Sequence, residues 1–330
     1  MQSNNKLKTR TPWLYLFFLS IVMSSWIWYM FNHKSFEIYT RQWATVITMV
    51  FGSFIAGASP EGSAAVAYPI FTLILKIPPA VARNFAFAIQ SIGMTSASLL
   101  IIGLRLKVDW NYIIYVTIGG VFGLFLGTYY VVPYISPVQA KLFFVSLYLS
   151  FGIALWRQNR YPQRKVFEKI ENFRHSDMCR LIIFGLIGGI ISSIFGTGIN
   201  IFTFCLMTIY YRVSEKVATP SSVIIMTIET ILGLFIHTQL INDFQPEAFE
   251  IWLACVPFVA IFAPLGSFVI SKMPRKGIAT LLYFILIIQF FGALIVIKPT
   301  LSQFGICLLV LVSGVGLFSY LASIRPVEKQ

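Results

Sequence analysis

Glu61, Arg83 and Glu229 are ionisable side chains that lie within or between long apolar stretches of this chain. If those stretches cross a membrane, a carboxylate there tends to become neutral and often relays protons. Glu61 and Glu229 are therefore candidates for proton coupling, with a structural hydrogen bond to the loop backbone as the alternative for Glu61. A guanidinium offers a fork of donors that matches two oxygens of an oxyanion. Arg83 is thus a candidate anion ligand, with snorkelling to the surface from a helix start as the alternative.

Two short glycine-containing breaks interrupt the apolar runs, at residues 59–63 (SPEGS) and 196–200 (GTGIN). A break inside a membrane exposes backbone polar groups, which only protein or a wet cavity can satisfy. Helices that begin at Gly62 and Gly198 would present free N–H groups and the positive ends of their dipoles, which attract anions. The alternative is that the small residues only permit tight helix packing. Additional side-chain donors are expected from Ser59, Ser63, Thr197 and Asn200.

A second matched zone follows each break, where a long helix is expected to begin. It reads Arg83-Asn84 in the first half and TPSS at residues 219–222 in the second, and Gln90 lies one to two turns into the first of these helices. The breaks and these zones together give the predicted substrate-binding set. It comprises Ser59, Glu61, Gly62, Ser63, Arg83, Asn84, Gln90, Gly196, Thr197, Gly198, Asn200, Thr219, Ser221 and Ser222.

The cysteines and histidines favour neither a metal site nor a cofactor. The four cysteines form no CxxC pair and three of them lie in apolar runs, which is typical of small core residues. Only His237 lies near membrane depth, and we expect it at the interface near a helix end. No GxSxG, HExxH or paired His–Asp motif occurs in the sequence. We therefore expect no metal, no cofactor and no enzyme, with an intramembrane enzyme and a non-transporting scaffold protein as alternatives.

The composition places these residues in a membrane protein. Of the 330 residues, 57% are hydrophobic and 11% are charged, and the mean hydropathy is +0.79. A soluble domain carries about 25% charged residues. The net charge of +13 comes from lysines and arginines in short loops, without a groove-reading motif, which argues against nucleic acid as a partner. The expected partners are a small anionic substrate and the lipid bilayer, and a homo-oligomer stays open.

The apolar runs are expected to form helices, because hydrocarbon cannot satisfy free backbone groups. The runs are too long for the strands of a membrane β-barrel, and their polar and apolar residues do not alternate. The first run follows three basic residues and is long enough to span, and no small-residue cleavage site follows it, so we expect an uncleaved signal anchor. The runs are residues 12–31, 43–59, 62–76, 80–104, 110–132, 138–156, 180–195, 198–211, 216–238, 247–271, 277–297 and 301–323.

A shift of 136 positions relates the five runs of the first half to the five of the second. We therefore expect an N-terminal cytoplasmic tail and anchor (1–42), a first repeat (43–156), a basic cytoplasmic linker (157–179), a second repeat (180–297) and a C-terminal helix and tail (298–330). The shift matches Gly62 with Gly198, Ile77 with Val213, Val81 with Val217, and Ala82 with Ala218.

The distribution of lysine and arginine predicts the topology, because cytoplasmic loops are enriched in both. With the N-terminus inside, nineteen of the 25 fall inside and four outside, while Arg83 and Lys141 lie within helices. Each repeat then crosses an odd number of times, whether its short pair forms two full spans or a re-entrant hairpin. The expected fold is an all-α polytopic bundle of two inverted repeats, each with a pair of short interrupted helices, plus extra N- and C-terminal transmembrane helices. The expected location is a bacterial cytoplasmic (inner) membrane, with both termini in the cytoplasm.

Around both breaks the chain resembles the TauE/SafE sulfite exporter family, also called the TSUP or anion permease family. That family shows a glycine-rich break, a short helix with a proline and an alanine-rich helix start, once in each half. Here the first copy reads GASPEGS (57–63), Pro69 and AVARN (80–84), and the second reads GTG (196–198) and VATPS (217–221). The resemblance covers roughly residues 45–297. The chain departs from the pattern at Pro60 and Glu61, which replace small residues, and at Cys205, which stands where the first half has Pro69.

The resemblance implies export or uptake of sulfite, thiosulfate or a small organosulfonate such as sulfoacetate, driven by an ion gradient. Inverted repeats with paired, interrupted short segments are also the general pattern of secondary transporters. A channel fits less well, because channels usually build their pores from several subunits. We therefore expect a secondary transporter of sulfite or an organosulfonate that works by alternating access, coupled to protons or another ion.

Overall fold

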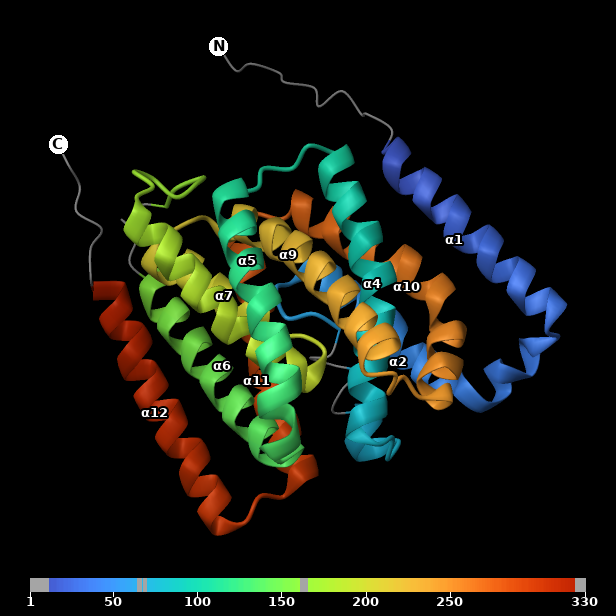
Figure 1. The fold of residues 1–330 in the computed structure, drawn as a ribbon. Coiled ribbons are helices and arrows are strands. Elements are labelled where there is room, and N and C mark those ends of the chain that lie inside the picture. The colour runs from blue at the N-terminus through green and yellow to red at the C-terminus, as the bar shows by residue number, and fades with distance from the viewer. Residues whose placement is uncertain (1–11, 64–66, 68–69, 161–165, 324–330) are drawn as a thin grey trace.

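The computed structural model describes residues 12–63, 67, 70–160 and 166–323 of the chain (Figure 1). Its regular elements are helices, and within the described ranges the only strand-like pairing is an isolated bridge between Phe167 and Val213. The prediction of an all-α fold is confirmed. The predicted run 62–76 is described only in part. The expectations that concern Lys6, Lys8, Arg10, Pro69, Arg325 and Lys329 fall outside the described residues.

The helices follow the predicted runs, with shifts of up to five residues at their ends. The first half contains α1 (Trp13–Asn32), η1 (Ser35–Glu37), α2 (Ile38–Ala58), the π-turn η2 (Ile70–Ile74), α4 (Pro79–Gly103), α5 (Trp110–Leu126) with its extensions η3 (Gly127–Val131) and η4 (Val132–Tyr134), and α6 (Pro137–Asn159). The second half contains α7 (His175–Phe195), α8 (Ile199–Cys205) with η5 (Leu206–Tyr210), α9 (Glu215–Phe235) with η6 (Ile236–Leu240), α10 (Pro246–Lys272), α11 (Arg275–Ile297) and α12 (Leu301–Ser323).

Nine helices of the described chain are long and apolar enough to cross a membrane. They are α1, α4, α5, α6, α7, α9, α10, α11 and α12, counted with their extensions. Their starts follow ordinary rules, since α4, α6 and α10 begin at Pro79, Pro137 and Pro246, where the missing N–H group costs nothing. The chain is thus a multi-pass membrane protein, as the composition predicted.

The helix pair α7–α8 forms a hairpin that enters and leaves at the same end of the bundle. The hydroxyl group of Tyr211, which follows η5, donates a hydrogen bond to Oδ1 of Asp177 in the first turn of α7, at 3.0 Å. The linker residue Phe167 bonds through its N–H group to the carbonyl of Arg212, at 2.9 Å. We call this the linker end. Two full spans and a re-entrant hairpin would both begin and end at one side, so the choice between them stays open.

The first hairpin consists of α2 and the segment that leads from it to α4. The start of α2 and the start of α4 both lie at the opposite end of the bundle, which we call the far end. Arg41 in the first turn of α2 pairs with Glu250 near the start of α10, at 3.4 Å. Asn84 near the start of α4 donates through Nδ2 to the carbonyl oxygen of Asp243, just before α10, at 2.9 Å. The two hairpins therefore enter the bundle from opposite ends.

The basic loops that were predicted to share one side do contact one another at the linker end. Lys107 pairs with Glu168 of the linker, and Arg275 pairs with Glu215 at the start of α9, at 3.5 Å. Asp109 accepts a hydrogen bond from the N–H group of Ile170, at 2.7 Å. Both ends of the described chain also lie at this end (Figure 1). Which compartment the linker end faces stays a prediction.

Helices of one half pack closely on helices of the other. An ideal Cβ on Gly57 of α2 would lie 1.8 Å from the carbonyl oxygen of Ala263 in α10. A shift of 136 positions converts this pair into Ser193 of α7 and Gly127 after α5, which also touch, because a Cβ on Gly127 would lie 2.3 Å from Ser193 Oγ. These glycines serve close packing, as the alternative interpretation of small residues proposed. The two-fold relation of the halves itself stays a prediction.

Replacement of Gly57 by valine should destabilise the protein, because the new side chain meets backbone atoms of α10 that cannot move aside. Overpacking of this kind costs about 1–3 kcal/mol or more. The apparent Tm in detergent is expected to fall by several degrees. Gly292→Val in α11 is the matched control, since a Cβ there meets no atom within 4 Å. Equal Tm values for the two variants would contradict the α2–α10 contact.

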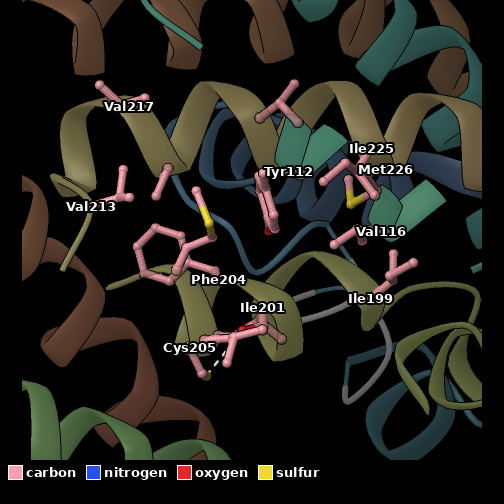
Figure 2. Packing of buried hydrophobic residues seen from close by; sticks show 14 of the residues in the cluster. Tyr112, Val116, Ile199, Ile201, Phe204, Cys205, Val213, Val217, Ile225 and Met226 are labelled. Atoms are coloured by element: carbon pink, nitrogen blue, oxygen red, sulfur yellow. Dashed lines mark hydrogen bonds between the residues drawn. The ribbon is translucent and has the colours of Figure 1, made fainter. Parts of the chain in front are cut away.

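The second hairpin lies in an apolar cluster between α5 and α9 (Figure 2). Tyr112 of α5 is fully buried and its hydroxyl group shares a 2.6 Å hydrogen bond with Thr203 of α8. Ile199 and Phe204 of α8 and Met226 of α9 belong to the same cluster. The hairpin is thus held on two sides by long helices, which fixes the position of its break.

Candidate functional site

The two breaks meet in the interior of the bundle. Gly62 has φ +75°, and an ideal Cβ there would lie 2.7 Å from Thr197 Oγ1, 2.9 Å from Gln90 Oε1 and 3.1 Å from Met226 Sδ. Gln90 and Met226 each stand about 16 Å along a spanning helix, α4 and α9 respectively. Four segments from both halves therefore converge near the middle of the spans. We call the group Gly62, Gln90, Thr197, Asn200 and Met226 the central cluster.

The second break is tied to α4 through its backbone. Gln90 donates from Nε2 to the carbonyl oxygen of Gly196, at 3.1 Å. Gly196 has φ +75°, and a Cβ there would lie 2.7 Å from the carbonyl oxygen of Arg83. Both the left-handed conformation and the close approach to backbone require glycine at this position. The break is therefore a fixed structural feature, held beside α4.

The first amides of α8 differ from the expectation of free N–H groups. The N–H group of Gly198 donates to Asn200 Oδ1 at 3.2 Å, and that of Ile199 donates to Ser192 Oγ at 3.0 Å. Thr197 Oγ1 also donates to Asn200 Oδ1, at 3.4 Å. The prediction that these amides are free is wrong for this conformation, because nearby side chains cap them. Instead, Thr197 Oγ1 and the N–H group of Gly198 both donate to Oδ1 of the Asn200 side chain.

Glu61 lies in the first break and is 3% exposed. Neither of its carboxylate oxygens has a hydrogen-bond partner among the residues that the structure describes. The expected alternative, a structural hydrogen bond from its carboxylate to the loop backbone, is therefore not present there. The ammonium group of Lys141 in α6 is close enough to Glu61 for the two charges to attract each other.

Lys141 was not among the predicted site residues. A single lysine one turn after a helix start is usually a surface residue, and no repeat partner drew attention to it. In the structure Lys141 is half-buried, and its Nζ lies 5.9 Å from the ring centroid of Phe195, the residue before the second break. Met226 was also missed, because a methionine in an apolar helix reads as a core residue.

Glu229 lies one turn beyond Met226 on α9 and is 1% exposed. Its carboxylate oxygens likewise have no hydrogen-bond partner within the described part of the chain. An ideal Cβ on Gly120 of α5 would lie 2.7 Å from Glu229 Oε2, so the carboxylate fills space that this glycine leaves open. Glu229 is thus near the central cluster and faces α5. Its role in proton coupling stays a prediction.

Arg83 directs its side chain away from the central cluster. Its guanidinium pairs with Asp243 Oδ2 at 3.1 Å and donates from Nε to Asn84 Oδ1 at 3.2 Å. Asn84 donates in turn to Gln245 Oε1, at 3.1 Å. The structure therefore groups Arg83 and Asn84 with an acidic partner at the far end, apart from the other predicted ligands.

His237 completes this group. It lies near a helix end, as expected, but it is 1% exposed and packed inside the protein. Its Nδ1 contacts Asp243 Oδ1 at 2.7 Å, and its ring stacks on Phe87 at 5.5 Å between centroids. Asp243 supplies a polar partner that makes burial of this histidine possible, and its expected position at the membrane interface stays a prediction. We call Arg83, Asn84, His237, Asp243 and Gln245 the far-end cluster.

The remaining predicted ligands are buried, and three of them, Ser59, Ser221 and Ser222, take part in local hydrogen bonds. Ser221 Oγ donates to the carbonyl of Val217 and accepts from the N–H group of Asp109, so it belongs to the linker end. Ser222 Oγ donates to the carbonyl of Thr219. Ser59 Oγ accepts from the N–H group of Glu61 at 3.3 Å. Binding roles for Ser59, Ser63, Thr219, Ser221 and Ser222 stay predictions.

A protein-family model described as "Sulfite exporter TauE/SafE" matches residues 44–292, about three-quarters of the chain. The matched range nearly coincides with the range over which the sequence resembles that family, and it contains both breaks. Neither the search of curated proteins nor the search of solved structures gave a match. Among the described residues, no group of three histidine, cysteine, aspartate or glutamate side chains is arranged to hold a metal ion.

Proposed function

Because the chain belongs to the sulfite exporter TauE/SafE family, we propose that it is a secondary transporter of sulfite or a small organosulfonate. The observation that carries the proposal is the meeting of the two breaks at Gly62 and Thr197, midway along the spanning helices. Polar, irregular backbone at that depth is tolerated where it serves a binding site or a wet cavity. Family membership indicates the class of anion, and the central cluster is the proposed binding site.

The proposed binding site is the central cluster together with the backbone of both breaks. Thr197 Oγ1 and the N–H group of Gly198 both donate to Asn200 Oδ1. An oxygen of a sulfite or sulfonate group that displaced this side-chain oxygen would receive both hydrogen bonds. Charge-assisted bonds to such an anion are about twice as strong as the neutral ones they replace. Asn200 thus occupies, in this conformation, the place that we assign to the substrate.

Two hairpins that enter from opposite ends support a mechanism of alternating access. We propose that the halves are inverted repeats, with α2–α10 and α5–α7 as equivalent contacts. The contact between Gly57 and Ala263, and its shifted counterpart between Ser193 and Gly127, support this relation. Rocking of one half against the other would then expose the central cluster to each side in turn. We further propose that the linker end faces the cytoplasm of a bacterial cell, since it carries most of the basic residues.

Coupling to protons is assigned to Glu61, with Glu229 as a second candidate. A buried carboxylate without hydrogen-bond partners is costly when ionised and is readily neutralised by a proton. Ionised, Glu61 would repel an anion at the first break. Protonated, it would donate a hydrogen bond to that anion. Each transported anion would therefore favour a protonated Glu61.

Purified protein should be thermally stabilised by the anion that it transports, through mass action. We expect sulfite or one organosulfonate to raise the Tm and a monocarboxylate such as acetate to leave it unchanged. The same anion should accumulate in vesicles when a proton or sodium gradient is imposed, and should not accumulate without one. No Tm shift and no flux with sulfite, thiosulfate, sulfoacetate or taurine would overturn the proposal. A scaffold protein or an intramembrane enzyme would then be the better interpretation of the chain.

A further inference from the structure

The helix α6 carries a polar and aromatic stripe that faces both breaks. Lys141, Phe144 and Tyr148 are spaced at i, i+3 and i+7, which places them on one face of the helix. Phe144 packs edge-on against Phe195 at 5.1 Å between centroids. The phenol of Tyr148 lies within range of the Glu61 charge. The helix α6 belongs to neither hairpin, but this stripe lies beside both breaks.

Lys141 is a cation that lies close to both breaks. Its ammonium group interacts with Glu61 of the first break and lies over the ring of Phe195, which precedes the second. Within the described residues, Tyr148 of α6 and Cys205 of α8 also lie within range of the Glu61 charge, and their phenol and thiol are ordinarily uncharged near neutral pH. The charge beside the first break is therefore set by Glu61 and Lys141.

Arg83 is the other cation that was predicted to bind the anion, but it belongs to the far-end cluster. The guanidinium of Arg83 lies against Asp243, so its positive charge is neutralised by a partner away from the breaks. The carboxylate of Glu61 has no hydrogen bond within the described residues, so its interaction with Lys141 can be exchanged without breaking one. An entering anion can therefore take the place of the Glu61 carboxylate beside Lys141.

We propose that Lys141 is a substrate ligand shared in turn by Glu61 and the transported anion. This inference rests on the proposed function and deepens it. When Glu61 is ionised it serves as the counter-ion of Lys141, and the anion is kept out. When Glu61 takes a proton from water, the anion becomes the counter-ion. One proton then moves with each anion, so transport of a singly charged anion moves no net charge.

The test uses the full-length protein in detergent, with the anion that stabilises the wild type as the probe. Affinity is read from the dependence of Tm on anion concentration at about pH 6 and about pH 8. Wild type should bind more tightly at the lower pH. Lys141→Gln should lose at least about tenfold in affinity at both pH values, and Lys141→Arg should retain most of it. Lys276→Gln, which removes an exposed lysine of α11, is the control and should bind as wild type does.

The double variant separates a ligand from a mere counter-ion. Glu61→Gln should bind the anion equally well at both pH values. If Lys141 contacts the anion, Glu61→Gln/Lys141→Gln should lose the same factor of about ten or more. If the double variant binds as tightly as Glu61→Gln alone, Lys141 only balances Glu61 and the inference is overturned.

A second readout does not depend on affinity. In vesicles, uptake of a singly charged sulfonate should be accompanied by proton uptake and should be insensitive to an imposed membrane potential. Dependence of the rate on that potential would contradict the shared-ligand scheme. Absence of any anion binding by the wild type would instead overturn the proposed function, so the two failures are distinguishable.

Discussion

Gly62→Ala is expected to abolish anion transport while leaving a folded protein in the membrane. The backbone at Gly62 is left-handed, with φ +75°, which costs about 1–2 kcal/mol for any residue with a Cβ. The added atom would also lie within 3 Å of Thr197 Oγ1 and Gln90 Oε1, the side chains that join the two breaks. Those side chains can move aside, so folding survives, but the donors of the site are displaced. A displacement of about 1 Å in a preorganised site lowers activity by up to about a hundredfold.

Labelled-anion flux in vesicles, normalised to the amount of folded protein, measures this effect. Gly292→Ala is the matched control, because a Cβ at that position of α11 is unopposed. Gly196→Ala should also lose flux, since it has the same φ, but it should be less stable than Gly62→Ala because its Cβ would meet the carbonyl oxygen of Arg83, a backbone atom that cannot easily move aside. Normal flux in Gly62→Ala would show that the substrate passes somewhere other than between the breaks.

Separation of Arg83 from Asp243 is expected to give the largest loss of stability among the polar substitutions. Arg83→Met and Asp243→Asn should each lower the free energy of unfolding by about 1–3 kcal/mol, less than for a fully buried pair because about a third of the Asp243 side chain is exposed. The double variant should lose less than the sum, by about 1 kcal/mol or more. Arg83→Lys should keep both stability and anion affinity, because the amine can still reach the carboxylate.

The exposed pair Arg41–Glu250 provides the control for this cycle. Arg41→Met should change the free energy of unfolding by no more than about 0.5 kcal/mol, since exposed ion pairs contribute little. Denaturant-induced unfolding in mild detergent gives the comparison. A stable Arg83→Lys protein that had lost anion affinity would return Arg83 to the set of substrate ligands and remove it from the far-end cluster.

The helices were predictable because a bilayer leaves the backbone few choices. Once the composition excluded a soluble fold, each apolar run had to be a helix, and the structure differs from the predicted boundaries by at most a few residues. The meeting of Gly62 with Thr197 was predictable for a related reason. Two copies of one break, inserted in opposite senses, were expected to approach each other near the middle of the membrane, and that expectation needed no knowledge of any side-chain contact.

The partners of individual polar groups were not predictable. Asp243 lies in a short loop 160 positions after Arg83, and an aspartate before a helix is ordinarily solvated. Ser192 and Asn200 cap the first amides of α8 through side-chain geometry that no periodic pattern encodes. Lys141 has no counterpart at the repeat spacing, where Gly277 stands instead. Side-chain direction in the folded bundle, rather than sequence position, decided each of these cases.

The pairing of α2 with α10 and of α5 with α7 has a consequence for how the protein is made. Ala263 leaves the ribosome roughly 200 residues after its partner Gly57, which at ordinary synthesis rates is a delay of about 10–40 s. During that interval the small-residue face of α2 lies in lipid without its final neighbour. Neither half can therefore reach its native packing alone, and the bundle closes as one late, cooperative event after most of the chain has been inserted.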